Sequence, residues 1–201
     1  TVEPLCLAAA LDPDIKGRPV KLFVPREEVL TTSWVRQGWN TKVKMGVKKD
    51  GTISAMKVEL VFDTGTSAEY GANPVRSAGY TSMGCYYVPN IWTDSYGVYT
   101  NKPFGGAYRG FGLPELMGGL EAVVDAIAYR IGMDPIEFRL KNLLKPGLPT
   151  CTGMPMPPHA LDKIIKKVAE KIDYHREEPP IRKGWKRGKG IALAITAPAM
   201  P

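Results

Sequence analysis

KVKMGVKKDGTISAMKVELVF, residues 42–62, is the stretch that decides the fold. Apolar and polar residues alternate on both sides of the pair Asp50-Gly51. The apolar positions are Val43, Met45, Val47, Met56, Val58, Leu60 and Phe62. A period of two is typical of a strand with one buried face, and Asp-Gly tolerates the positive φ angles of a tight hairpin turn. The stretch therefore predicts a β-hairpin with one apolar face.

A long amphipathic helix is predicted over residues 113–131. Its apolar residues recur at the spacing of one helix face: Leu113, Leu116, Met117, Leu120, Val123, Val124, Ile127, Ala128 and Ile131. Gly118 and Gly119 lie inside this helix, where each costs about 1 kcal/mol relative to alanine. We interpret both as a point of close packing, and Gly132 as the end of the helix.

Two shorter helices follow in the pattern. Asp134-Pro135-Ile136-Glu137 has a capping aspartate, a proline at the first helical position and a glutamate that reaches back, and this helix runs to about Leu143. Residues 159–172 predict another helix. Its expected inward residues are Ile164, Ile165, Val168 and Ile172.

The rest of the chain predicts a short helix, three strands and one long loop. Residues 63–84 are rich in Gly, Ser and Ala and have too little apolar periodicity for a regular element, so we expect an ordered loop. The other elements are a helix over 2–11 and strands over 20–24, 93–100 and 191–195. Helices after a hairpin, with strands at both ends, indicate an α+β fold with a mixed sheet and packed helices.

Composition limits the class of protein. The chain has 201 residues, of which 44% are hydrophobic, enough for a core. It has no run of about 18 apolar residues, so no membrane span is predicted. The net charge of +7 keeps a basic nucleic-acid-binding domain as an alternative, but the lysines fall on polar faces of periodic segments, and we expect no nucleic-acid partner.

Cysteine and histidine are scarce. Cys6, Cys85 and Cys151 are odd in number and far apart, which argues against a disulfide framework and favours a reducing, cytoplasmic compartment. His159 and His175 are the only histidines, and no Cys-x-x-Cys pair exists. We therefore expect no metal held by this chain's own side chains, because zinc and iron–sulfur sites need more such ligands.

A glycine-rich loop, GGAYRGFG over residues 105–112, comes directly before the long helix. Four glycines in eight residues allow sharp turns and a close approach to a ligand. Arg109 offers a planar fork of donors for oxo or phosphate groups, and Phe111 offers a flat face for a ring. The alternative is an ordinary loop that leads into a helix, with a surface arginine and a buried ring.

Several segments together resemble the molybdenum-cofactor-binding subunit of the xanthine dehydrogenase and aldehyde oxidase family. They occur in the family's order and cover most of the chain: residues 17–21, 26–28, 88–91, 100–101, 107–112, 114–115, 134–143 and 185–190. A lone glycine loop would be weak support, whereas an ordered set of motifs is strong.

The resemblance implies that residues 1–201 are an internal part of a larger molybdopterin-binding domain. Residues 1–112 would be mainly strands and the cofactor and substrate loop. Residues 113–173 would be helical, and residues 174–201 would be a linker and a strand leading to a C-terminal half. The family's Gly-Gly-x-Phe-Gly-Gly loop and its catalytic glutamate do not occur in this sequence, so we expect this chain alone to be inactive.

The resemblance also implies hydroxylation of an electron-poor carbon. In this family a molybdenum–molybdopterin cofactor performs the chemistry, and electrons leave through [2Fe–2S] centres, often to FAD, on partner domains or subunits. The expected substrate is an N-heterocycle such as a purine, with xanthine the leading choice and an aldehyde the second. The alternative from another class is a non-catalytic assembly or binding module that keeps the fold.

Four residues take roles by position in the resemblance. Phe111 would lie against the substrate ring, while Arg109 and the backbone around Ala107 would face the cofactor and its oxo ligand. Gly110 would let the main chain approach. Arg76 would serve as the substrate-polarising arginine of purine-oxidising members, stabilising negative charge that builds on the ring.

Overall fold

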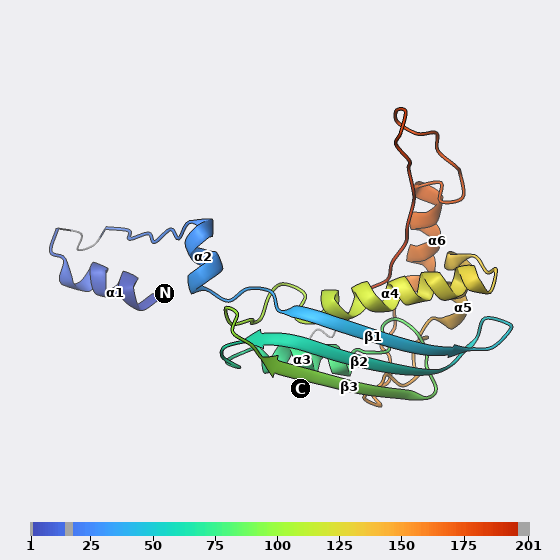
Figure 1. Ribbon diagram of the computed structural model, residues 1–201, viewed down its shortest axis with the longest axis horizontal. Coiled ribbons are helices and arrows are strands. Elements are labelled where there is room, and N and C mark those ends of the chain that lie inside the picture. Colours follow the sequence, from blue (N-terminus) through green and yellow to red (C-terminus); the bar gives the residue numbers. More distant parts are fainter. Residues whose placement is uncertain (1, 15–17, 197–201) are drawn as a thin grey trace. The chain divides into compact units, whose positions relative to one another are not determined.

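The computed structural model describes residues 2–14 and 18–196, which fall into two units divided between Trp34 and Val35. The first unit contains α1 (Val2–Leu11), as predicted, and α2 (Arg26–Thr32) (Figure 1). The strand predicted over 20–24 is wrong, because the described residues 18–25 have no regular structure. A lone strand has no ladder to stabilise it, whereas acidic residues at positions 27 and 28 favour the start of a helix.

A mixed three-stranded sheet forms the frame of the second unit (Figure 1). Its strands are β1 (Gly38–Val47), β2 (Ile53–Gly65) and β3 (Ile91–Tyr99), in the order β1-β2-β3. The predicted hairpin is confirmed, since β1 and β2 pair antiparallel and Gly51 has a φ of +86° in the turn. β2 and β3 pair parallel, which confirms the mixed sheet and requires a crossover between them.

That crossover contains α3 (Ala72–Tyr80), where the sequence predicted a loop over 63–84. The prediction was wrong because α3 packs through small side chains. Ser77 and Ala78 are buried, and a Cβ added to Gly79 would lie 3.5 Å from the Cβ of Ser95 on β3. A helix face made of such residues produces little hydrophobic periodicity.

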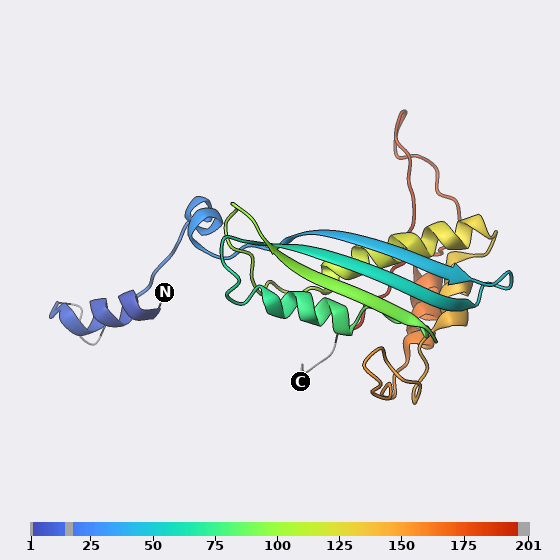
Figure 2. The same ribbon diagram turned by 60° about the horizontal axis from the view of Figure 1, so that its bottom comes forward.

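The long helix α4 (Leu113–Arg130) lies along β1, while α3 lies along β2 and β3 (Figure 2). The predicted apolar face of α4 is largely confirmed. Four of its positions are fully buried: Leu116, Leu120, Val124 and Ala128. The interpretation of the two glycines is half right. A Cβ on Gly119 would lie 2.7 Å from Cγ2 of Thr41, whereas a Cβ on Gly118 would meet open space.

Two helices follow α4. In α5 (Pro135–Asn142) the predicted cap is confirmed, because Oδ1 of Asp134 accepts hydrogen bonds from the backbone N–H groups of Ile136 and Glu137 at 2.9 Å. α6 (Leu161–Lys171) is also confirmed as a helix, but its predicted inward face is wrong in three of four positions. Ile165 is buried, whereas the other three are exposed: Ile164, Val168 and Ile172.

The strand predicted over 191–195 does not form. Leu193 is buried, but its backbone N–H donates to Oε2 of Glu121 at 3.0 Å and not to a neighbouring strand. The apolar alternation there reflects packing of one side of an extended segment against the core. Among the helices of residues 2–14 and 18–196, none has the length and apolarity to cross a membrane.

A buried polar network joins α4 and α5 to the rest of the core. Arg139 is fully buried and donates from Nε and Nη2 to Oε2 of Glu121, at 3.0 and 2.8 Å. Its Nη1 donates to Oδ1 of Asp125 at 2.6 Å. The Tyr86 hydroxyl donates to the other Glu121 oxygen at 2.6 Å. Removing one charge would leave the opposite charge uncompensated in a site with little access to water.

We predict that Arg139→Met lowers the free energy of unfolding by about 3–5 kcal/mol, because Glu121 then remains buried without its cation. Lys141→Met on the same helix is the control, since Lys141 lies 3.5 Å from Asp50 in an exposed pair. Such a pair contributes at most about 1 kcal/mol. Urea unfolding followed by circular dichroism measures both, and equal midpoints would refute the prediction.

The two glycines of α4 give a second prediction. Gly118→Ala should raise the free energy of unfolding by about 0.5–1 kcal/mol, because alanine restricts the unfolded chain and meets no neighbour. Gly119→Ala has the same propensity gain but forces a contact with Thr41, so we expect a net loss. Thermal unfolding midpoints of the two variants must move in opposite directions.

Candidate functional site

The glycine-rich loop 105–112 is anchored at the end of the sheet where β2 finishes. The Gly105 N–H donates to the carbonyl of Thr64 at 3.0 Å, and the Gly106 N–H donates to the carbonyl of Val35 at 3.1 Å. Val35 also forms an isolated parallel bridge with Gly105. The first half of the loop is therefore fixed to the frame before it reaches the residues of interest.

The carboxylate of Asp63 fixes the chain that leads into this loop. It accepts hydrogen bonds from the Thr100 hydroxyl and the Gly65 N–H, and Nζ of Lys102 lies 2.9 Å away. The Thr100 hydrogen bond, followed by the Lys102 contact, lowers the pKa of Asp63. A lowered folded-state pKa means that this stabilisation is present above the ordinary carboxyl pKa and is lost as the pH falls through the lowered value.

The second half of the loop has three consecutive residues with positive φ: Gly110 (+102°), Phe111 (+51°) and Gly112 (+88°). Glycine adopts such angles freely, whereas a phenylalanine there is strained. Gly112 has a further steric requirement, because an added Cβ would run into the carbonyl oxygen of Pro74 on α3. This close approach lets α4 begin directly against α3, and Phe111 is turned into its strained conformation one residue earlier.

The Phe111 ring is half-buried and meets one other aromatic ring. Its centroid lies 5.9 Å from that of Tyr70, with the planes inclined at 62° in an edge contact. Tyr70 is half exposed. The sequence prediction did not include Tyr70, because it lies in the Gly- and Ser-rich region that gave no signal for a site.

Arg36 holds the outer part of the loop by three interactions. Its Nη2 donates to the carbonyl of Arg109 at 2.6 Å, and its Nη1 donates to Oε1 of Glu115 at 2.8 Å. Its guanidinium carbon also lies 4.7 Å from the ring centroid of Tyr108, within cation–π range. The sequence prediction missed Arg36, which is more than seventy residues away and carries no motif.

The structure places Arg109 and Phe111 on the same loop, two residues apart, with Ala107 partly buried and Gly110 exposed beside them. The Arg109 side chain is exposed and has no hydrogen bond or ion pair within residues 2–14 and 18–196. Arg76 has another environment: it is exposed on α3 and its Nη2 donates to Oδ1 of Asn73 at 3.2 Å. Its role in substrate polarisation stays a prediction.

Two buried acceptor atoms flank the loop without hydrogen-bond partners in the described part of the chain. They are Oε1 of Gln37 and Oε2 of Glu115. Gln37 lies against Gly105, and its Nε2 donates to the carbonyl of Gly71 at 3.1 Å. Buried polar atoms are normally paired, so these two acceptors mark a place suited to additional N–H or O–H donors.

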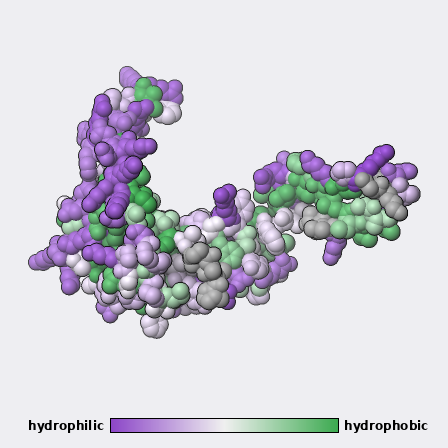
Figure 3. All heavy atoms as spheres, turned by 180° about the vertical axis from the view of Figure 1, so that it is seen from behind, coloured by the Kyte–Doolittle hydropathy of each residue, from purple (hydrophilic) through white to green (hydrophobic). Residues whose placement is uncertain are grey.

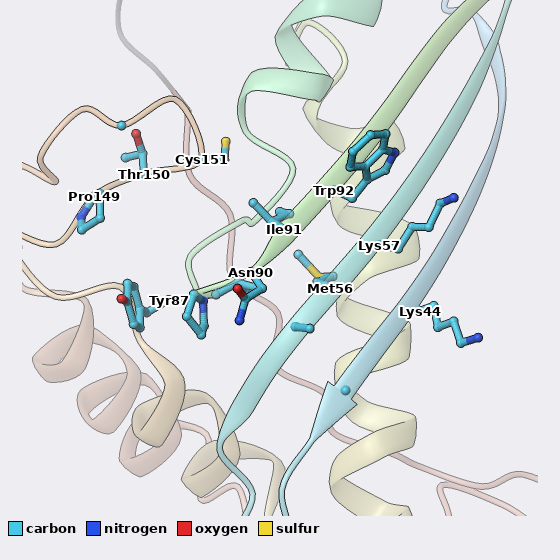
Figure 4. A pocket seen from close by; sticks show the side chains of 15 residues that line it. Lys44, Met56, Lys57, Tyr87, Asn90, Ile91, Trp92, Pro149, Thr150 and Cys151 are labelled. Carbon is cyan, nitrogen blue, oxygen red and sulfur yellow. The ribbon is translucent and has the colours of Figure 1, made fainter.

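A surface hollow of about 810 Å³ lies at the opposite end of the sheet (Figure 4). Lys44, Lys57 and Trp92 border it on the strands, and Thr150 and Cys151 face them from a loop. Along β2 the ladder runs from position 56 beside this hollow to position 65 beside the glycine loop. At about 3.3 Å per residue the two are separated by roughly 30 Å, so the hollow is not part of the loop site.

No three His, Cys, Asp or Glu side chains gather as a possible metal-ligand group in residues 2–14 and 18–196. The three cysteines are free thiols. Burial, and then the nearby Glu121 carboxylate, raise the pKa of Cys85 to about 12, which keeps this thiol protonated and unsuited to ligation.

Residues 1–143 match the family model of the molybdopterin cofactor-binding domain. The chain belongs to this family, as the motifs predicted. It is 37% identical over 164 residues to the nicotinate dehydrogenase large molybdopterin subunit of Eubacterium barkeri, covering 79% of this chain and 39% of that protein. It is 33% identical to the aldehyde oxidoreductase of Megalodesulfovibrio gigas, over 97% of this chain and 21% of that protein.

A solved structure agrees with the sequence relatives. The aldehyde oxidoreductase from Desulfovibrio gigas superposes with a TM-score of 0.67 at 33% identity, covering 73% of this chain and 16% of that one. The prediction of an α+β fold, part of a larger molybdopterin-binding domain, is therefore confirmed. The chain spans two fifths or less of the length of these curated relatives.

We predict that Arg36→Met loosens the loop by removing all three interactions. Exchange of the Phe111 and Leu113 amide hydrogens, which bond to the carbonyls of Tyr108 and Gly110, should accelerate by about tenfold. Arg130→Met, an exposed position at the end of α4, is the control. Hydrogen exchange with fragment resolution measures the effect, and unchanged loop exchange would show that Arg36 does not hold it.

Proposed function

We propose that this chain forms part of a molybdenum hydroxylase that oxidises an electron-poor carbon of an N-heterocycle, such as a purine or a pyridine. The observation that carries the proposal is the strained, half-buried Phe111 beside an exposed, unpaired Arg109. Strain in a backbone persists where the surroundings enforce it, and such residues concentrate at ligand sites. Similarity to a nicotinate dehydrogenase subunit supports a ring substrate.

The loop residues suit molybdopterin, which is flat, polar and anionic and carries N–H donors. Arg109 would bind its charged groups, the backbone at Ala107 and Gly110 would approach it, and the unpaired acceptors of Gln37 and Glu115 suit such donors. When bound, the cofactor supplies the molybdenum centre at which oxygen is transferred and two electrons are accepted.

The chain's own residues position the reactants. Phe111 presents its ring to a flat substrate and fixes the plane in which the electron-poor carbon lies. Arg109 provides a positive charge where negative charge develops. Arg36 keeps the loop in place through the Arg109 carbonyl and Glu115, so the backbone that carries both groups is already ordered when a ligand arrives.

The remaining parts of the enzyme are also proposed. The rest of the molybdenum subunit would supply the base and the remaining cofactor contacts. [2Fe–2S] and FAD partners would carry the electrons away. The three free thiols favour a cytoplasmic location.

An aldehyde oxidoreductase is the second candidate. The observation that favours it is 33% identity over 97% of the chain to such an enzyme. An aldehyde substrate needs no ring stacking and no cation to polarise ring nitrogens. Turnover of a ring substrate should therefore depend on Phe111 and Arg76, whereas turnover of an aldehyde should not. Normal oxidation of purines by an Arg76→Ala enzyme would show that Arg76 does not polarise the substrate.

The first test is the molybdenum and pterin content of the native protein isolated with its partners. About one of each per chain, with turnover of xanthine or nicotinate in a screen that includes aldehydes, is the expected result. Turnover of aldehydes alone would favour the second candidate. Iron and flavin without molybdenum, or none of the three, would favour a non-catalytic assembly module.

In the complete enzyme we predict that Phe111→Ala lowers kcat/KM for a ring substrate by about two- to tenfold, since an aromatic contact contributes about 0.5–1.5 kcal/mol beyond buried area. Molybdenum content should stay unchanged. Arg109→Met should lower kcat/KM as well, while Arg130→Met serves as the matched arginine control. Full activity of both loop variants would refute the proposed site.

A further inference from the structure

Within the described residues, helix α6 packs only one of its two apolar rows against the core. Leu161, Ile165 and Ala169 face the core, with Ile165 only 1% exposed. A second apolar row, at spacing i, i+4, i+8, is left open to solvent. Its members are Ile164, Val168 and Ile172, which are 54%, 43% and 39% exposed.

A row of lysines runs beside these exposed apolar residues. Lys163, Lys167 and Lys171 repeat at the same spacing and are all exposed. None of the three forms an ion pair with any residue in the described ranges of the chain. Because residues three apart are neighbours on a helix surface, each of Ile164 and Val168 has a lysine adjacent to it. Figure 3 shows hydrophilic side chains gathered over α6 with hydrophobic ones beside them.

The open row ends in a second surface hollow, of about 1060 Å³. Ile172 and Lys171 line it together with the aromatic residues Tyr129 and Trp185, which are themselves half exposed or more. Its rim is also basic. It includes Arg176, which is paired with Asp173, and Arg187 and Lys189, which are paired with Glu178. Lys186 and Glu177 complete its charged residues.

We propose that this surface of α6, defined by Ile164, Val168 and Ile172 with Lys163, Lys167 and Lys171, docks an acidic amphipathic helix of a second polypeptide. The apolar row and the lysine row both repeat with the period of a helix over about three turns, which a helix lying lengthwise matches. Carboxylates on that helix complement the unpaired lysines. The hollow next to Ile172 accepts a bulky side chain at its end.

This proposal is independent of the cofactor loop, and its test requires no turnover. The probe is a fluorescein-labelled peptide of repeated Glu-Leu-Ala-Ala-Leu-Glu-Glu heptads, titrated with the 201-residue chain and followed by anisotropy. The variant Lys163→Glu/Lys167→Glu/Lys171→Glu should weaken binding by at least about tenfold, since three exposed ion pairs are lost and replaced by repulsion.

The matched control is Lys44→Glu/Lys48→Glu/Lys49→Glu, which changes the net charge equally at exposed lysines of β1 and the hairpin turn. Its affinity should stay within about twofold of the parent, because exposed charges beyond a Debye length are largely screened. Circular dichroism checks that both variants keep their helix content. If both variants bind the peptide with equally weakened affinity, net charge alone explains the effect and the proposal is overturned.

Three further outcomes also overturn it. A peptide with its leucines replaced by glutamine that binds equally well would leave the apolar row without a role. Binding of anionic phosphatidylglycerol vesicles in place of the peptide would identify a lipid surface. Self-association of the chain that disappears in Ile164→Ser/Val168→Ser would identify a second copy as the occupant.

In the native enzyme isolated with its partners, carbodiimide joins lysine and carboxylate groups only where they touch. Links from Lys163, Lys167 or Lys171 to carboxylates three or four residues apart on another polypeptide support the proposal. Links confined to carboxylates of the same polypeptide would show that the surface is covered internally, and would overturn it.

Discussion

The carboxylate of Glu121 is the interaction on which the rest of the second unit depends. Its two oxygens accept hydrogen bonds from Arg139 on α5, from the Tyr86 hydroxyl and from the backbone of Leu193. Three segments far apart in the sequence are thereby tied to the middle of α4. Because a buried carboxylate is stable only when its donors are all in place, these contacts fix the position of α4 as a unit. Because the loop 105–112 leads directly into α4, the position of α4 also fixes the end of this loop.

The geometry of the loop follows from the start of α4. Gly112 is pressed against the carbonyl of Pro74, so α4 and α3 share one contact at the point where the loop ends. The loop must then reverse direction within a few residues, and Phe111 adopts a left-handed conformation that glycine would adopt without strain. Arg36 and the Thr64 carbonyl hold the other half. Steric closeness on one side and hydrogen bonds on the other together impose the strain at Phe111.

Local patterns predicted the elements whose signal lies within a few residues. The hairpin, α4 and the cap of α5 were found because alternation, helical spacing and a capping aspartate are all short-range features. α3 was missed because Ser77, Ala78 and Gly79 pack by being small. Residues 191–195 have the apolar alternation of a strand. Such alternation indicates that one side of an extended segment is buried, but it does not indicate a neighbouring strand to pair with. In the site, Arg109 and Phe111 belong to a contiguous motif, whereas Arg36 and Tyr70 reach the loop only through the fold.

The direct contacts of the loop lie between residues 35 and 115 of the described chain, while the Glu121 network acts on it through α4. Its conformation is therefore set by this part of the protein before any ligand arrives, which is the condition for fixed charges and rings to favour one bound geometry. The polar groups beside this backbone have the opposite character, since the exposed Arg109 side chain and the two buried acceptors of Gln37 and Glu115 lack partners in the described part of the chain. The proposed ligand site rests on this combination of a fixed backbone and unsatisfied polar groups, and the proposed docking surface of α6 rests on a comparable one, an apolar row beside unpaired lysines.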